Sequence, residues 1–231
     1  MPFVANALAL VPCVRHQGYY VGNYAENAEQ NNWGQSLLSA LTERLRPGGC
    51  AVSYAKGLDD LGNKSSSDGF GEAKKLAAAA EAVVVVLGLA FNSFCHGSGT
   101  GEVGPCSGPC RSNSHCEGEA KDRTAVELPE GQAKMVAALR RAVGSDTPLV
   151  GVMVHGGAIA LGETLGQLDA LLDAWQPGLE GGPAIAATLV GDASPAGRTA
   201  VTWYSSSAEI PRFGYMGEQA VGTLFLHSRV M

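Results

Sequence analysis

Short runs of apolar residues alternate with stretches of helical periodicity along the chain. The clearest run is Val83 to Leu89, an unbroken and mostly β-branched stretch that is typical of a strand buried on both faces. Shorter apolar runs predict further strands at residues 7–11, 51–54, 149–154, 170–175 and 198–204. Together these runs predict a sheet of about six strands.

Helices are predicted between these strands. They cover residues 33–45, 71–82, a stretch that starts near 128, and residues 184–189. The third helix should open at Leu128-Pro129-Glu130, because proline fits the first turn and an acidic side chain suits its positive end. The alternation of strand and helix predicts an α/β fold, with a mostly parallel sheet flanked by helices on both faces.

The 231 residues suit one well-packed domain, which we expect over residues 1–204, followed by an irregular tail at 205–231. A long segment between Ala90 and Glu127 is dense in glycine, cysteine, serine and proline, and its Cys-rich part spans about residues 93–116. Loops of this length in compact domains are usually functional or disordered. A first strand that starts so close to Met1 suggests a piece of a longer protein.

The six cysteines leave several states open. They are Cys13, Cys50, Cys95, Cys106, Cys110 and Cys116. Crowding in one loop favours disulfides and a secretory route, and free thiols remain an alternative. A zinc site is conceivable, but the tight C-x2-C pairs of zinc knuckles are missing. We therefore expect no metal site, and no motif calls for a cofactor.

Composition excludes several classes of partner. Apolar residues make up 45% of the chain and charged residues 16%, which suits a folded protein with a buried core. The net charge is −6 and no basic run is present, so we expect no binding to nucleic acid or to an anionic membrane. The first residues lack the charged region and cleavage site of a signal peptide, which leaves the localisation open.

The loops that follow parallel strands are where ligands bind, so candidate chemistry is sought there. A dinucleotide fingerprint is excluded, because no glycine follows the first strand before Gly18. His155-Gly156-Gly157 resembles an oxyanion loop, but the chain has no G-x-S-x-G nucleophile, so a tight turn is the better interpretation. Glu117, Glu119 and Asp122 are candidates for acid/base work, or are simply solvated loop residues.

Several short motifs follow one another in a fixed order. They are Gly22-Asn23-Tyr24, Val52-Ser53-Tyr54-Ala55-Lys56-Gly57, Gly88-Leu89, Glu117-x-Glu119 with Asp122-Arg123, Leu128-Pro129-x-Gly131-Gln132, Pro177-x-x-Glu180-Gly181-Gly182, Gly191-Asp192-x-x-Pro195-x-Gly197-Arg198 and Thr202-Trp203-Tyr204. In this order the motifs resemble the C-terminal α/β-sandwich domain of glycoside hydrolase family 3, especially that of plant-type β-xylosidases.

The resemblance implies part of a retaining exo-β-glycosidase of the β-xylosidase or β-glucosidase type, which hydrolyses O-glycosyl bonds. In that family a TIM-type barrel, absent from this sequence, supplies an aspartate nucleophile, and the α/β domain supplies the general acid/base. By position, Glu117 is the acid/base, Glu119 a possible modulator of it, and Tyr24 a substrate-binding aromatic. Retaining chemistry places its two carboxyl groups about 5 to 5.5 Å apart.

The other matched residues have structural roles by this comparison. Asp122 and Arg123 are expected to pin the catalytic loop, and Asp192 and Arg198 to clamp a turn. The implied partners are a β-linked oligosaccharide or glycoside and a barrel domain in the same or another chain, and full-length relatives are expected outside the cell, in the cell wall or in the vacuole. The alternative is a non-catalytic fragment that binds a sugar or a protein.

Overall fold

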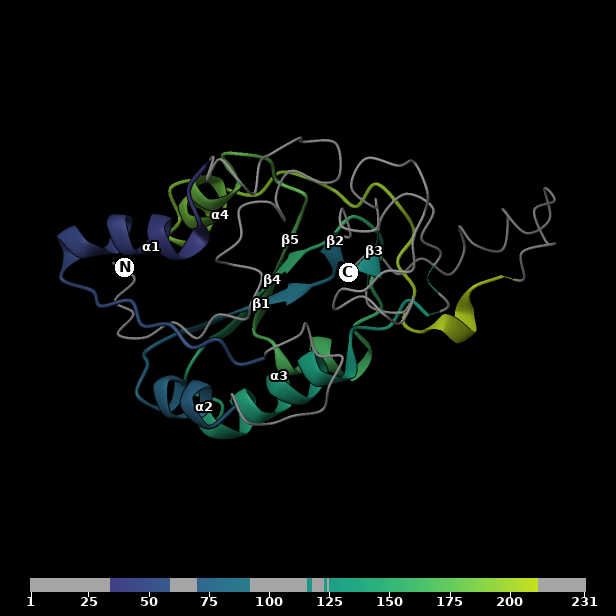
Figure 1. The fold of residues 1–231 in the computed structure, drawn as a ribbon, viewed down its shortest axis with the longest axis horizontal. Coiled ribbons are helices and arrows are strands. Elements are labelled where there is room, and N and C mark those ends of the chain that lie inside the picture. Colours follow the sequence, from purple (N-terminus) through teal and green to yellow (C-terminus); the bar gives the residue numbers. More distant parts are fainter. Residues whose placement is uncertain (1–33, 59–69, 92–115, 118–122, 124, 212–231) are drawn as a thin grey trace, which may run out of the picture.

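The computed structural model describes residues 34–58, 70–91, 116–117, 123 and 125–211 (Figure 1). The predicted strand at residues 7–11 lies outside these ranges. In chain order the helices and strands are α1 (Leu37–Leu45), α2 (Phe70–Ala78), β1 (Val83–Gly88), β2 (Ala90–Phe91), β3 (Cys116–Glu117), α3 (Glu130–Val143), β4 (Leu149–Val154), β5 (Ala170–Trp175) and α4 (Gly181–Leu189). Short 3₁₀ helices add Arg46–Gly48, Gly162–Gln167 and Ser207–Glu209.

The central sheet is parallel, with the strand order β1-β4-β5. Val83 to Gly88 pair in register with Leu149 to Val154, and β5 pairs with the other side of β4. The strands β2 and β3 form a second, two-stranded parallel sheet. The predicted α/β class with a parallel sheet is therefore confirmed, although the described residues form fewer strands in the main sheet than expected.

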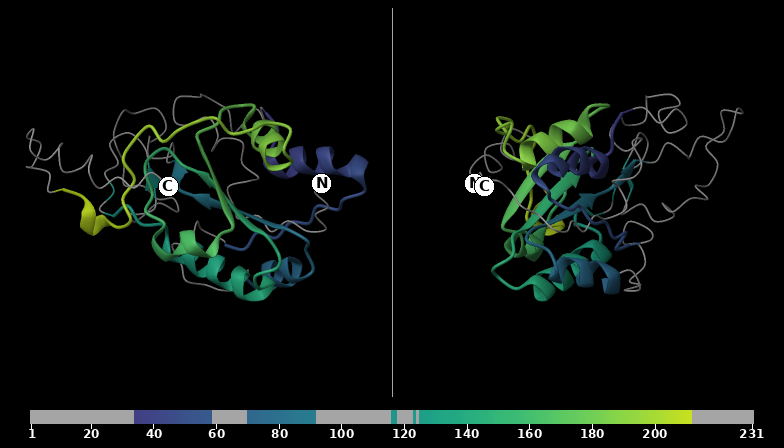
Figure 2. Two further views of the ribbon diagram at one scale, coloured as in Figure 1. Left: turned by 180° about the vertical axis from the view of Figure 1, so that it is seen from behind. Right: turned by 90° about the vertical axis from the view of Figure 1, so that its left-hand side faces the viewer.

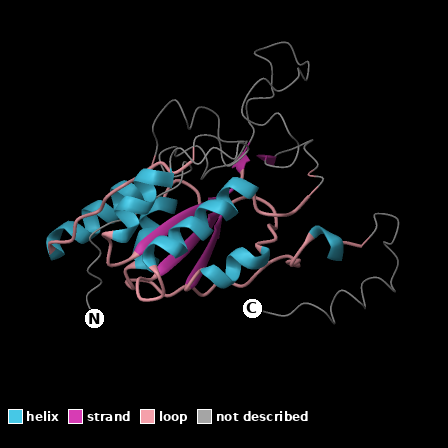
Figure 3. Ribbon diagram, turned by 90° about the horizontal axis from the view of Figure 1, so that it is seen from below, coloured by secondary structure: helices cyan, strands magenta, loops and turns pink. Residues whose placement is uncertain are grey.

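Helices cover both faces of the sheet, which makes three layers (Figures 1 and 2). One face packs against α2 and α3, where Met135 and Leu139 belong to the same buried cluster as Val85 of β1. The other face packs against α1 and α4, where Leu41 and Ile185 belong to the same cluster as Val84. Every residue of β1 is buried, as the unbroken apolar run predicts. Figure 3 shows the strands from below, between the helices.

Local sequence sets the helix ends. The Ser36 hydroxyl caps α1 by accepting a hydrogen bond from the backbone N–H of Ser39 at 3.2 Å. The same helix passes into a 3₁₀ turn at Pro47 and stops at Gly49, whose φ of 76° lies in the left-handed region. The third helix begins close to its predicted start, at Glu130, with Pro129 directly before its first turn and not inside it, whereas α2 ends at Ala78, four residues before its predicted end at 82.

Two predicted strands of the described region are not strands. Residues 51–54 form no ladder; instead, Val52 and Tyr54 pack their side chains against the cluster between the sheet and α1. Residues 198–204 are also irregular, because the stretch is mostly exposed and Val201 keeps 46% of its surface in solvent. An apolar run forms a strand only where a neighbouring strand completes its hydrogen bonds.

The predicted irregular tail starts at residue 205, and the structure describes it as far as residue 211. The predicted irregular tail contains one short 3₁₀ helix at Ser207–Glu209. Among the described residues, every helix is too short or too polar to cross a bilayer.

Candidate functional site

Glu117 lies beyond the carboxyl end of the main sheet. The chain leaves β1 at Gly88 and continues through Leu89 into β2, and β3 runs parallel to β2 with Glu117 opposite Phe91. This is the edge at which parallel sheets bind their ligands. The backbone of Glu117 therefore lies where the sequence predicts an acid/base residue, while Tyr24, Glu119 and Asp122 lie outside the described residues.

Gln132 fixes the point where the chain leaves β1. Its side-chain carbonyl accepts from the backbone N–H of Gly88 at 2.9 Å, and its amide donates to the Gly88 carbonyl at 2.7 Å. The side chain is fully buried on α3. A side chain of α3 thus makes the hydrogen bonds of the N–H and C=O groups of Gly88, the last residue of β1. Without it, another strand would have to pair with these groups.

Gly88 must be glycine at this exit. Its φ of 146° lies outside the regions open to other residues, and a Cβ atom there would lie 1.8 Å from the carbonyl oxygen of Val154. The close approach lets β1 stay paired with β4 while the chain turns toward β2.

Arg123 ties the segment after Glu117 to the turn that follows β4. Its Nη2 donates a hydrogen bond of 2.7 Å to the carbonyl of Ala158. The prediction that Arg123 pins the catalytic loop as a pair with Asp122 stays a prediction, because Asp122 lies outside the described residues. The turn that receives Arg123 consists of residues 155–158.

His155 opens this turn and is buried at the carboxyl end of β4. Its Nδ1 lies 2.6 Å from the Gly157 carbonyl oxygen, and its Nε2 lies 2.7 Å from Oδ1 of Asp173 on β5. The imidazole side chain has no exposed surface, whereas 24% of the Asp173 side chain is exposed. The sequence-based interpretation of residues 155–157 as a tight turn is right, but it assigns no role to the imidazole.

The end of β5 is distorted beside His155. The backbone N–H of His155 donates to the Trp175 carbonyl at 3.1 Å, and the pairing skips Ala174, which makes a bulge. Trp175 has a φ of 49°, the positive value of a non-glycine residue. Two indole rings flank the imidazole, with the Trp175 centroid at 5.1 Å and that of Trp203 at 5.5 Å.

Asp192 is an anchoring residue at the opposite side of the molecule. Its carboxylate forms an ion pair with Arg44 of α1, whose Nε donates at 3.0 Å and whose Nη2 also contacts the same oxygen. This contact links the turn after α4 to α1. The predicted clamp between Asp192 and Arg198 stays a prediction: the partner of Asp192 in the structure is Arg44, and Arg198 lies in the exposed stretch that follows.

Glu127 holds the segment before α3 to the start of the tail. Its two carboxylate oxygens accept from the backbone N–H and the hydroxyl of Ser207, each at 2.6 Å. The Ser207 hydroxyl accepts in turn from the N–H of Val126 at 3.0 Å. These hydrogen bonds, with the Ser207 hydroxyl the largest cause, hold the pKa of Glu127 below its ordinary value.

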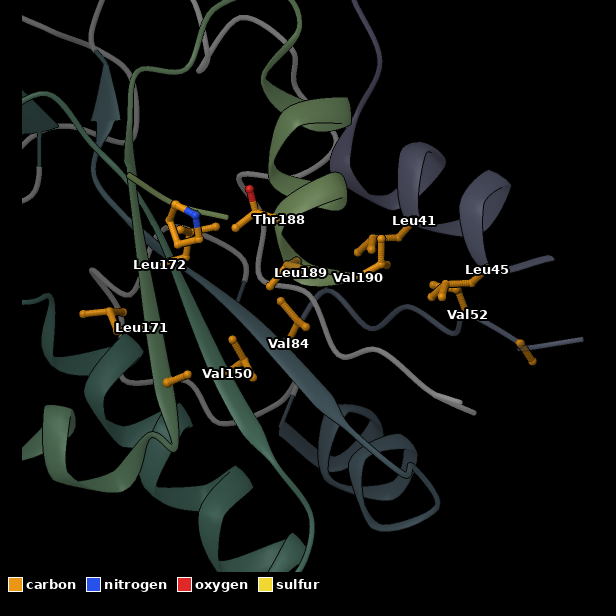
Figure 4. Close-up of a pocket in the computed structure, with 13 residues that line it drawn as sticks. Leu41, Leu45, Val52, Val84, Val150, Leu171, Leu172, Thr188, Leu189 and Val190 are labelled. Carbon is orange, nitrogen blue, oxygen red and sulfur yellow. The ribbon is translucent and has the colours of Figure 1, made fainter. Parts of the chain in front are cut away.

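An apolar cavity lies at the other end of the sheet. It has a volume of about 280 Å³ and lies between the sheet and the helices α1 and α4 (Figure 4). Its strand residues Val84, Val150 and Ala170 stand at the amino ends of β1, β4 and β5. The cavity is therefore remote from Glu117 and has no acid or base in its lining.

Comparison with known proteins decides the family. The family model for the glycosyl hydrolase family 3 C-terminal domain matches residues 4–226. The chain belongs to this family. The family 3 resemblance of the motifs is thereby confirmed.

Relatives of this family 3 domain include proteins named as β-xylosidases. Beta-D-xylosidase 1 of Arabidopsis thaliana is 29% identical over 195 residues, which cover 83% of this chain and 21% of that protein. The xylan 1,4-beta-xylosidase of Xylanibacter ruminicola is 39% identical over 92 residues, which cover 40% of this chain and 10% of that protein. The chain thus spans about a fifth of the length of the first relative and about a tenth of the length of the second.

Solved structures agree with the fold. A GH3 exo-beta-xylosidase in complex with a xylobiose aziridine probe matches with a TM-score of 0.63 at 26% identity, over 86% of this chain and 22% of that chain. The beta-glucosidase of Listeria innocua matches with a TM-score of 0.69 at 21% identity, over 91% of this chain and 25% of that chain. The second likeness shows the fold alone.

Within this family 3 domain, the described residues contain no group of three or more His, Cys, Asp or Glu side chains that could hold a metal ion. The Cys-rich segment with its two histidines lies outside the described residues, apart from the backbone of Cys116. Sequence reasoning missed the pairing of His155 with Asp173. Its signal was an acidic residue inside the apolar run 170–175, close to a histidine that directly follows the neighbouring strand.

Proposed function

We propose that this family 3 domain forms part of a retaining β-glycosidase of the β-xylosidase or β-glucosidase type. The observation that carries the proposal is the position of Glu117 on β3, beyond the carboxyl end of the sheet and opposite Phe91 of β2. The names of the relatives, a β-D-xylosidase and a xylan 1,4-β-xylosidase, support a β-linked glycoside as the substrate.

Glu117 serves as the general acid/base in this proposal. It protonates the glycosidic oxygen as the bond to the leaving group breaks, and it then takes a proton from the water that releases the sugar. The attacking carboxylate is an aspartate of a barrel domain outside these 231 residues, in the same polypeptide or in another one. Glu119 modulates Glu117 by its like charge, and Tyr24 contacts the sugar.

Two contacts of the described residues support a defined position for Glu117. On the β2 side, Gln132 is hydrogen-bonded to Gly88, and the chain continues from Gly88 into β2, where Phe91 pairs with Glu117. Downstream, Arg123 is hydrogen-bonded to Ala158 of the turn after β4. A catalytic acid needs such fixation, because a displacement of about 1 Å can cost about 100-fold in rate.

A chimeric enzyme tests the proposal. The 231 residues replace the matching segment of Arabidopsis Beta-D-xylosidase 1, and hydrolysis of 4-nitrophenyl β-xyloside is followed. Glu117→Gln should reduce kcat/KM by about 10²- to 10⁴-fold, the usual contribution of a general acid. The loss should be smaller for a 2,4-dinitrophenyl glycoside, because its leaving group needs less protonation, and azide should restore turnover.

Glu127→Gln is the matched control, since this carboxylate is bonded to Ser207 and has no part in the proposed reaction. Its activity should stay close to that of the parent chimera. The 231 residues alone should not hydrolyse an aryl β-xyloside. An active parent chimera whose Glu117→Gln variant loses less than tenfold on both substrates would contradict the assignment of Glu117.

A further inference from the structure

The buried imidazole of His155 faces an oxygen acceptor at each ring nitrogen. Nδ1 lies 2.6 Å from the carbonyl of Gly157, and Nε2 lies 2.7 Å from the carboxylate of Asp173. A carbonyl and a carboxylate can only accept, so both nitrogens must carry a hydrogen to make both bonds. A neutral imidazole has one N–H, and with no exposed surface the ring has no solvent contact to satisfy a nitrogen left without a bond.

We propose that His155 and Asp173 hold one additional proton as a buried imidazolium–carboxylate pair, and that this proton fixes the turn to which the Glu117 segment is tied. The proton belongs to the ring, because a carboxylic acid is ordinarily the stronger acid. The Asp173 side chain is also 24% exposed, so its negative charge keeps contact with solvent.

The pair is connected to the Glu117 segment through the backbone. The Nδ1–H bond closes the turn 155–158 onto Gly157, and the next carbonyl, that of Ala158, accepts from Arg123. Arg123 follows Glu117 by a few residues, so a change in the turn is transmitted to the segment after Glu117. The consequence for catalysis rests on the proposed function, whereas the pair itself does not.

The charged groups at the ring set the direction of the pH dependence. Among the described residues in contact with the ring or its turn, β5 contributes the Asp173 carboxylate, and Arg123 brings its guanidinium to the turn. Trp175 and Trp203 contact the ring without ionising. Arginine keeps its charge throughout, so raising the pH removes the ring proton. The two hydrogen bonds of the ring are therefore complete at low pH, and one of them is lost as the pH rises.

The 231-residue chain can be tested directly by NMR with ¹⁵N-labelled histidine. In the folded chain both ring nitrogens of His155 should carry a proton, whereas only one should do so in Asp173→Asn, and the parent ring should lose one proton as the pH is raised. Tryptophan fluorescence should change in the same step, because the two indoles adjoin the ring. Exchange of the Arg123 guanidinium protons, after correction for intrinsic base catalysis, should rise about tenfold there, as expected when a hydrogen bond is lost.

Asp173→Asn separates the proton from the shape of the site. The new amide has nearly the shape of the carboxylate and can donate to an unprotonated Nε2, so a neutral imidazole then makes both bonds. The turn should stay closed, with slow Arg123 exchange, while the fluorescence step disappears. In His155→Phe the step should also disappear, but Arg123 should exchange fast at every pH.

Three results would overturn the inference. They are a His155 ring with a single protonated nitrogen at every pH, an unchanged fluorescence step in Asp173→Asn, and Arg123 exchange that ignores the state of the ring. None of these measurements depends on turnover, so an active chimera that keeps its rate in Glu117→Gln would reject the proposed role of Glu117 and leave the His155–Asp173 pair unaffected.

Discussion

The two ends of the parallel sheet are filled in opposite ways. At the carboxyl ends, the buried polar side chains of Gln132 and His155 are hydrogen-bonded to the backbone and to Asp173. At the amino ends, an apolar cavity of about 280 Å³ separates the strands from α1 and α4. Directional hydrogen bonds fix the buried side chains at the first end, whereas the cavity at the second end is enclosed almost entirely by apolar side chains.

The difference between the two ends of the sheet predicts where substitutions should be tolerated. A buried polar group that loses its partner costs the full desolvation of the group left behind. An apolar site with free volume can accept another methyl group. We therefore expect large losses from changes at the carboxyl end and gains from suitable changes at the amino end.

The largest effect is expected for Gly88→Ala. The added Cβ would lie 1.8 Å from the carbonyl oxygen of Val154, in a backbone region closed to alanine, so the sheet would have to break there. We expect a loss of at least about 4 kcal/mol in the free energy of unfolding, or failure to fold. Urea denaturation measures the loss.

Gly71→Ala is its control, because this helical glycine has open space around its Cβ position. It should be neutral or raise the free energy of unfolding by up to about 1 kcal/mol. Equal effects of the two substitutions would show that Gly88 has no special requirement for glycine.

Gln132→Leu should have the next largest effect. Leucine fills a similar space but leaves both backbone groups of Gly88 without their bonds, so we expect a loss of about 2–3 kcal/mol. Thermal and urea unfolding measure it. Gln167→Leu is the matched control, since its buried side-chain oxygen has no hydrogen-bond partner among the described residues; it should change stability by less than about 0.5 kcal/mol. A larger loss of stability in Gln167→Leu would show that the hydrogen bonds of Gln132 are not what makes its replacement costly.

At the amino end, Val84→Ile should increase stability by about 0.8 kcal/mol, because the added methylene can enter the cavity. Val86→Ile is the paired test. It adds the same group to the same strand and the same apolar cluster, two residues farther from the amino end, where the cavity does not reach. There we expect a loss of about 1 kcal/mol from overpacking. Effects of the same sign would show that the cavity does not distinguish the two ends.

The smallest effect concerns Glu127. Its pKa is lowered in the folded chain, so its bonds to Ser207 contribute stability above the pKa of the unfolded chain, and this contribution disappears as the pH falls through the folded pKa. The pair is exposed, so we expect under about 1 kcal/mol. Unfolding followed from pH 6 down to pH 3 should show a shallower decline in Ser207→Ala than in the parent chain. Parallel curves would contradict this.

The fold was readable from the sequence where burial alone decides the structure. The strands at 149–154 and 170–175 have their predicted bounds, and β1 is buried throughout. The runs at 51–54 and 198–204 look similar but form no strand. A strand also needs a neighbouring strand to complete its hydrogen bonds, and the residues of a run do not reveal whether that neighbour exists.

The site was predictable only in part, for a comparable reason. Glu117 could be proposed as a candidate because the carboxyl edge of a parallel sheet is a general ligand site, and its catalytic role stays a prediction. The bond from His155 to Asp173 joins the residue directly after β4 to a residue on β5, and these strands become neighbours only after folding, so spacing along the chain gives little sign of it. The role of Gln132 was also hidden. A buried glutamine on a helix is unfavourable by itself, and only the folded structure shows that Gly88 supplies its hydrogen-bond partners.

The paired bonds of Gln132 also have a consequence for association between molecules. In a parallel ladder the N–H and C=O of one residue point to the same side, so those of Gly88 point away from β4. An exposed pair of such groups invites a strand from another chain. The glutamine amide imitates a peptide unit at that place and occupies it, which shields the last step of β1 from intermolecular β-sheet growth.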